Sequence, residues 1–125
     1  MGLFSFGKSN TSASRNLNWS KIETIESLQK ALAGSNKTPA LFFKHSTRCS
    51  ISSMALNRFE KEWGESNNCD IYFIDLIANR DVSNTLSEVA NVQHQSPQVM
   101  LIKNGKAVYN ASHSAIDAEE IKTNL

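Results

Sequence analysis

A β-hairpin near the C-terminus is the part of the fold that this sequence specifies most narrowly. The segment SPQVMLIKNGKAVYNAS contains two strand-like runs joined by Asn104-Gly105. A two-residue type I′ turn requires positive φ at both central residues, and Asn-Gly is a pair that favours this geometry. The chain therefore has to place two antiparallel strands side by side, and its other elements must be compatible with them.

Two further strands and four helices are predicted from apolar spacing. The run ALFFKH follows Pro39, and the run CDIYFIDL opens at Cys69 and is nearly continuous in apolar residues, as expected for a strand covered on both faces. An apolar stripe that begins at Ile51 marks one of the helices. Helical spacing covers residues 19–35, 50–63, 81–92 and 117–125. Because a helix between two strands lets them pair in parallel, we predict an α/β fold with a mixed four-stranded sheet flanked by helices, the thioredoxin-like arrangement.

Length and charge narrow the class of protein. A chain of 125 residues suits one domain, and we expect a flexible tail at residues 1–16 and the domain at residues 17–125. Thirteen Lys and Arg against twelve Asp and Glu leave a net charge of +1 without a basic block, so nucleic acid is not an expected partner. The tail has too few apolar residues for a signal peptide or a membrane span. We expect a cytoplasmic protein with reduced cysteines and no membrane partner.

Cys49, in the stretch KHSTRCSIS, is the candidate nucleophile. It lies at the predicted start of a helix, where unpaired N–H groups and the helix dipole favour the thiolate that attacks disulfides. Arg48, Lys44 and His45 would add positive charge if their side chains turned toward the sulfur. A buried core cysteine is the alternative, although the polar neighbours of Cys49 fit an exposed turn better. Cys69 opens an apolar strand and is predicted to be inert.

The position three residues after Cys49, where a dithiol enzyme carries its second thiol, is Ser52. Its hydroxyl can hydrogen-bond to a thiolate but cannot attack a mixed disulfide, so another thiol would have to release the product. A merely exposed helix serine is an equally good interpretation of Ser52.

Ser96-Pro97 directly precedes the hairpin, and we predict a cis bond there because that loop lies against the active-site cysteine in a thioredoxin-like fold. An ordinary trans proline at a strand start is the alternative. His45, His94 and His113 show no metal-ligand spacing with the cysteines, so we expect no metal site. We interpret His45 as a polar residue at a strand end and the other two histidines as solvated or loop-anchoring.

Three motifs, FKHSTRCSIS, DLIANRDVSNTLSE and HQSPQVMLIKNGKAVYNASHSAI, follow one another between about Trp19 and Ile121. In sequence, order and spacing they resemble the YtxJ family, the monothiol bacilliredoxins also called BrxC. The resemblance implies a thioredoxin-like fold and a monothiol disulfide oxidoreductase that removes the low-molecular-weight thiol bacillithiol from protein mixed disulfides. It also implies bacillithiol as a co-substrate with no bound cofactor, bacillithiolated client proteins, and regeneration by a low-molecular-weight thiol or a partner redoxin.

The resemblance also implies roles for individual residues. Cys49 matches the single catalytic cysteine, and His113 falls in the family's ASH segment without an assignable role. The residues expected to contact the substrate are Arg48, Ser50, Ser52, Ser96 and Pro97. The family usually carries proline directly after the cysteine, and Ser50 in this chain changes the first helical turn without removing the nucleophile.

Three alternative functions remain open from the sequence. A dithiol reductase would use Cys49 with Cys69, although the chain has no CxxC motif. A non-catalytic redox-sensing or binding module would keep the fold and only have Cys49 modified by oxidants. An iron–sulfur carrier of the monothiol glutaredoxin type would require the CGFS motif, which this chain lacks.

Overall fold

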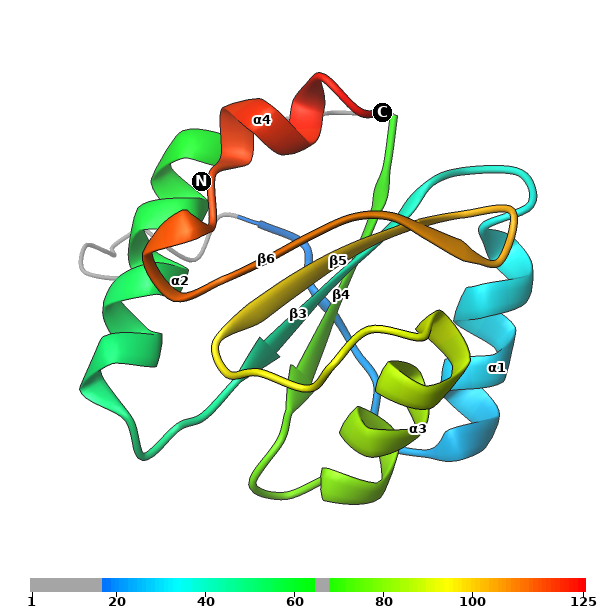
Figure 1. Cartoon of the computed structure of the whole chain (residues 1–125), viewed down its shortest axis with the longest axis horizontal. Helices are drawn as coiled ribbons and strands as arrows, with labels where there is room; N and C mark the ends of the chain where they lie inside the picture. The colour runs from blue at the N-terminus through cyan, green and yellow to red at the C-terminus, as the bar shows by residue number, and fades with distance from the viewer. Residues whose placement is uncertain (1–16, 65–67) are drawn as a thin grey trace, which may run out of the picture.

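The computed structural model describes residues 17–64 and 68–125, so the predicted tail lies outside the described residues. A mixed sheet forms the middle layer, with α1 and α3 on one face and α2 and α4 on the other (Figure 1). The elements in chain order are β2 (Ser20–Lys21), α1 (Ile25–Gly34), β3 (Ala40–His45), α2 (Ser50–Trp63), β4 (Asp70–Asp75), α3 (Arg80–Ala90), β5 (Gln98–Lys103), β6 (Lys106–Ser112), η3 (His113–Ala115) and α4 (Ala118–Lys122).

Within the described residues the sheet has five strands in the order β2-β4-β3-β5-β6. β3 pairs with β4 in parallel and with β5 antiparallel, and β5 pairs with β6 antiparallel. The prediction of four strands was therefore wrong by one. The missed strand, β2, is a two-residue edge strand that pairs in parallel with β4. Its residues lie within the helix predicted over residues 19–35, and that helix, α1, begins only at Ile25, after its N-cap Thr24.

The predicted hairpin is confirmed. β5 and β6 are joined at Asn104 and Gly105, whose φ values are 53° and 76°. Both central residues thus have the positive φ that the turn requires. β5 is buried along nearly its whole length, whereas β6 alternates between exposed and half-buried residues, as an edge strand does.

Two apolar cores lie on the two faces of the sheet. On the α2 and α4 face, Phe43 packs with Phe59 and Trp63. On the α1 and α3 face, Phe42 packs with Met100 and other apolar side chains. Because β3 is in the middle of the sheet and covered on both faces, all six of its residues are buried, and two of them are polar. The two polar residues stand at the strand's last positions and therefore require partners.

Candidate active site

Cys49 is the N-cap of α2 and the last residue of the segment 46–49, which connects β3 to that helix. Its backbone is extended (φ −115°, ψ 120°), its N–H donates to the Ser46 carbonyl (3.2 Å), and its own carbonyl accepts from the Ser53 N–H (3.1 Å). The side chain is half-buried and makes no capping hydrogen bond to the first turn of the helix. The thiol therefore lies at the end of a helix with the first-turn N–H groups available to stabilise negative charge.

Ser52 neither bonds to the Cys49 sulfur nor faces solvent, the two possibilities that the sequence offered for it. It is fully buried, its Oγ lies 2.7 Å from Nδ1 of His45, and it accepts a hydrogen bond from the Ser46 N–H (3.1 Å). The hydroxyl therefore ties the first turn of α2 to the end of β3 instead of contacting the Cys49 sulfur or facing solvent. His45, with an exposed fraction of 6%, is the polar strand-end residue that was predicted.

The buried stripe of α2 consequently starts one residue later than predicted. Ile51 is 61% exposed and Met54 is 68% exposed, whereas Ser52 faces the protein interior. The polar partner His45 at the end of β3 explains why a serine takes the inward position in this turn. Apolar spacing cannot reveal this exchange, because it assigns buried positions to apolar residues.

Ser96-Pro97 is cis, as predicted. Pro97 is buried, and its carbonyl accepts a hydrogen bond from the backbone N–H of His113 (3.0 Å). The next residue, Gln98, pairs with Lys44 across the β3–β5 ladder, so the proline lies at the end of β3 from which the chain runs to Cys49. The structure thus brings the loop before β5 and the segment between β3 and α2 to one end of the sheet (Figure 1).

Of the residues predicted to contact the substrate, Arg48 and Ser50 are exposed and Ser96 has a buried hydroxyl. Arg48 and Ser50 are exposed on either side of Cys49. Ser96 has a buried Oγ for which no hydrogen-bond partner exists among the described residues. A buried hydroxyl without a partner is unusual, and this one belongs to the loop beside the site.

Lys44 does not turn toward the sulfur. Successive strand residues point to opposite faces of the sheet, and His45 already faces α2. The Lys44 side chain accordingly enters the opposite core, where its Nζ donates to Ser87 Oγ (2.6 Å) on α3 and to His94 Nδ1 (3.1 Å). The expectation that Lys44 could act directly on Cys49 was therefore wrong.

Cys69 lies at the other end of the sheet. It directly precedes Asp70, which pairs with Ala40 at the start of β3, whereas Cys49 follows His45 at the end of β3. At about 3.3 Å per residue, the length of β3 separates these ends by roughly 16 Å, well beyond the reach of a disulfide of about 7 Å. The geometry excludes an internal Cys49–Cys69 disulfide in this fold.

The environment of Cys69 is also unreactive. Its sulfur donates to the neighbouring carbonyl of Asp70 (3.4 Å) and packs against the apolar core beneath α2. Burial, with the negative charge of Asp70, raises the pKa of the Cys69 thiol to about 12. Cys69 therefore stays protonated at neutral pH.

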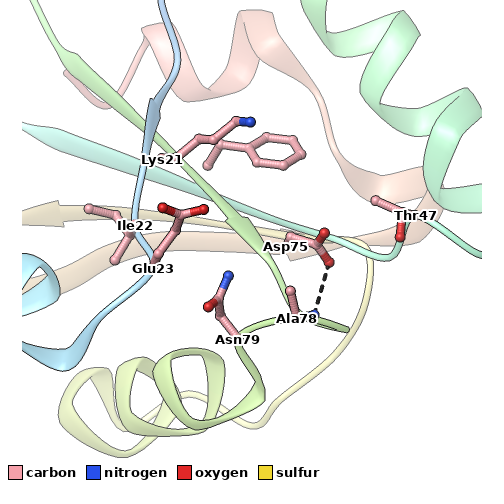
Figure 2. A pocket seen from close by; sticks show the side chains of 8 residues that line it. Lys21, Ile22, Glu23, Thr47, Asp75, Ala78 and Asn79 are labelled. Atoms are coloured by element: carbon pink, nitrogen blue, oxygen red, sulfur yellow. Dashed lines mark hydrogen bonds between the residues drawn. The ribbon is translucent and has the colours of Figure 1, made fainter.

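A pocket of about 180 Å³ opens beside the segment that leads to Cys49. Figure 2 shows its charged and polar lining, in which Asp75 turns back to accept a hydrogen bond from the Ala78 N–H (3.3 Å). The lining residues are Lys21, Ile22, Glu23, Thr47, Phe73, Asp75, Ala78 and Asn79. Because neither Cys49 nor the proline loop lines this pocket, it is separate from the thiol.

Two further findings concern only residues 17–64 and 68–125. No group of three or more His, Cys, Asp or Glu side chains is placed to hold a metal ion. In the same residues, every helix is too short or too polar to cross a membrane.

Comparison with known proteins gives one family and one fold. The sequence profile of the family described as monothiol bacilliredoxin BrxC matches residues 20–121. A solved structure described as a proposed oxidoreductase with a thioredoxin fold is 28% identical, covers 82% of this chain and 89% of that one, and has a TM-score of 0.72. A mutant thioredoxin from Halobacterium salinarum NRC-1 is 16% identical, with 83% and 84% of the two chains covered and a TM-score of 0.62. A thioredoxin from Malassezia sympodialis is 14% identical, with 86% and 87% covered and a TM-score of 0.66.

These likenesses confirm the predicted thioredoxin fold. Together with the family match, they support thiol redox chemistry as the general function.

Proposed function

Because the chain belongs to the monothiol bacilliredoxin BrxC family, we propose that it removes bacillithiol, or a similar low-molecular-weight thiol, from protein mixed disulfides through Cys49. The observation that carries this proposal is the single sulfur at the site. Cys49 begins α2, the position three residues later holds a buried hydroxyl bonded to His45, and Cys69 lies at the opposite end of the sheet. A mixed disulfide on Cys49 therefore has no internal thiol to resolve it.

The proposed reaction consists of two thiol–disulfide exchanges. In the first, the Cys49 thiolate attacks the bacillithiol sulfur of a client mixed disulfide, so a new S–S bond forms as the old one breaks and the client leaves as a thiolate. In the second, the thiolate of another bacillithiol attacks the bacillithiol sulfur on Cys49. This step releases bacillithiol disulfide and returns Cys49 as a thiolate. Electrons and atoms balance without a bound cofactor.

The residues around Cys49 have distinct proposed roles. Exposed Arg48 and Ser50 flank the sulfur and are available to an incoming client or thiol. Ser96 and Pro97 lie in the loop at the same end of the sheet, and the Ser96 hydroxyl, which has no partner among the described residues, is a candidate hydrogen-bonding group for the substrate. Ser52 acts by fixing the first turn of α2, so we assign it a positioning role instead of substrate contact.

The proposed setting follows from the chemistry. The exchange requires a reduced Cys49, so we place the protein in the cytoplasm, where the thiol pool is reducing. Its partners there would be bacillithiolated proteins and the free thiol, or a redoxin, that regenerates it.

The test is an intact-mass measurement after mixing the protein with a bacillithiolated test protein. We expect one bacillithiol on the wild type and on Cys69→Ala, none on Cys49→Ala, and release of the test protein's free thiol. A folded wild type that accepts no bacillithiol would contradict the proposal and favour a non-catalytic sensor. Transfer only from a glutathionylated test protein would keep the exchange reaction and replace bacillithiol with glutathione.

A further inference from the structure

Lys44 is a buried cation that the proposed reaction does not use. Its side chain has no exposed surface, and it forms no ion pair with any described residue. Among the described residues, its ammonium group donates to Ser87 Oγ (2.6 Å) and His94 Nδ1 (3.1 Å) and to no other side chain. A buried charge without a counter-ion costs folding free energy, and burial lowers the pKa of Lys44 to about 8. A residue kept at such a cost in the middle of the sheet calls for a structural reason.

The neighbour of Lys44 across the sheet makes similar contacts. Lys44 on β3 is the register partner of Gln98 on β5, so the two side chains lie beside each other on the same face. Gln98 is 1% exposed. Its Nε2 donates to the Gln93 carbonyl (3.0 Å), and its Oε1 accepts from the Gln95 N–H (3.2 Å). Both members of this buried polar pair therefore hold the short segment 93–95.

The direction of the Lys44–His94 hydrogen bond is fixed by chemistry. An ammonium group can only donate, so Nδ1 of His94 must be the acceptor and the ring proton must be on Nε2. Ser83 Oγ lies 3.4 Å from the same nitrogen and approaches from α3. His94 is thereby held between β3 and α3, two residues before Ser96.

We propose that Lys44 is a positioning residue of the thiol-exchange site: through His94, and in parallel with Gln98, it holds the segment 93–97 against the end of β3 at which a mixed disulfide on Cys49 must bind. This inference rests on the proposed function. We call the four residues Lys44, His94, Gln98 and Ser87 the loop clamp. Lys44 contacts no reacting atom, so its effect on exchange is indirect.

The loop clamp also responds to acid. The charged groups that act on His94 are both cations, Lys44 on β3 and Arg80 on α3, and with burial they lower the pKa of His94. His94 is thus neutral at pH 7. Protonation would remove the Nδ1 acceptor and place a second positive charge beside Lys44, so the clamp opens as the pH falls below the usual histidine range.

The first measurement is amide hydrogen exchange on the full chain. Lys44→Met keeps the side-chain length without its donors, and His94→Leu removes the acceptor. We expect both to speed exchange at residues 93–97 by at least about tenfold while β6 stays protected. His94→Asn, whose amide oxygen can replace Nδ1 as the acceptor, should restore protection. Lys30→Met, which changes an exposed lysine on α1, is the matched control.

The second measurement is the rate of bacillithiol transfer from a test protein, beside the alkylation of Cys49 by iodoacetamide. Lys44→Met and His94→Leu should lower transfer by about tenfold or more but leave alkylation within about twofold, because the small reagent needs no loop. Between pH 7 and pH 5, transfer relative to alkylation should fall for the wild type and stay level for His94→Asn.

Each outcome bears on a different claim. Unchanged hydrogen exchange in both variants would overturn the loop clamp. Faster hydrogen exchange with unchanged transfer would overturn the positioning role. If the wild type transfers no thiol, the proposed function fails and the positioning role fails with it, whereas hydrogen exchange still decides whether Lys44 holds the segment.

Discussion

Cys49 and Cys69 stand at opposite ends of the same pair of parallel strands, β3 and β4. Cys49 follows the carboxyl end of β3, caps a helix and has a half-buried sulfur without a capping hydrogen bond. Cys69 precedes the other end of β4, packs against the core and donates to the Asp70 carbonyl. The same side chain is thus the proposed nucleophile after the end of β3 and a core residue before the start of β4.

The polar residues repeat this contrast. At the carboxyl end of β3, Lys44 and His45 are buried and bind the proline loop and α2 respectively. At the start of the same strand, Ala40 and Leu41 enter ordinary apolar cores. Hydrogen bonds concentrated at one end of a central strand fix the elements that surround Cys49. We infer that the carboxyl end of β3 positions the elements around Cys49, whereas the start of β3 contributes to the apolar cores.

The largest expected effect comes from replacing each of the two cysteines with serine in turn. Cys49→Ser should reduce bacillithiol transfer by at least about 10⁴-fold, because a hydroxyl cannot replace the thiolate nucleophile. Cys69→Ser should leave transfer within about twofold. Transfer rates from a bacillithiolated protein measure both. Equal losses of the transfer rate in the two variants would contradict the comparison, because both cysteines would then be needed for the exchange.

The second test compares the reactivity of the two sulfurs in one molecule. The pKa of Cys69 is raised from 9.0, the value of an unperturbed cysteine, to about 12. At a given pH its thiolate form is therefore about a thousandfold rarer than that of an unperturbed thiol. We expect iodoacetamide at pH 8 to label Cys49 at least about a hundredfold faster than Cys69. Peptide mass spectra over time measure the two rates. Similar rates would contradict the assignment of Cys69 as inert.

The third test uses alkaline pH, where Lys44 and Cys69 should change the free energy of unfolding in opposite directions. Burial lowers the pKa of Lys44 from 10.5 to about 8, so folding disfavours the charged lysine. The free energy of unfolding therefore rises as the pH increases from 8 to 10.5, because the buried lysine loses its charge. The pKa of Cys69 is raised to about 12 from 9.0, so its share is full below pH 9 and is lost as the pH rises.

Denaturant unfolding between pH 8 and pH 10.5 measures this contrast. Relative to Lys44→Met, the wild type should gain on the order of 3 kcal/mol across this range. Relative to Cys69→Ala, the wild type should lose stability above pH 9. Parallel pH curves for the wild type and Lys44→Met would show that Lys44 is not a buried charge.

The smallest effect concerns the hydroxyl beside the nucleophile. Ser52→Ala leaves the Ser46 N–H and His45 without this partner and should cost about 1–3 kcal/mol of unfolding free energy. Ser50→Ala, at an exposed position two residues earlier, should change it by less than about 0.5 kcal/mol. Chemical denaturation compares the two variants. Equal effects would mean that the Ser52 hydrogen bonds do not stabilise this turn.

The sequence predicted the parts of the molecule that depend on local chemistry. The Asn104-Gly105 turn, the helix that begins after Cys49 and the order of the elements all follow from turn preferences and apolar spacing. The two-residue strand β2 was missed, because its partner β4 defines it and its residues were assigned to the helix predicted over residues 19–35.

The place of Cys49 was predictable from the sequence, and the contacts of the residues around it were less so. The sequence placed Cys49 between a strand and a helix, and the structure has it at the N-cap of α2, whereas the inward turn of Ser52 depends on His45 from another element. The direction of Lys44 depends on strand parity and on the distant residues Ser87 and His94. Contacts between residues far apart in sequence leave no signal in the spacing of one chain.

The central claim is that the two cysteines of one chain are chemically different, and a peptide map tests it most directly. The wild type would be treated with a bacillithiolated test protein, quenched with acid, digested and analysed by mass spectrometry. The account predicts bacillithiol on the peptide that contains Cys49 and an unmodified Cys69. Bacillithiol on Cys69, or a disulfide joining the two cysteine peptides, would contradict it.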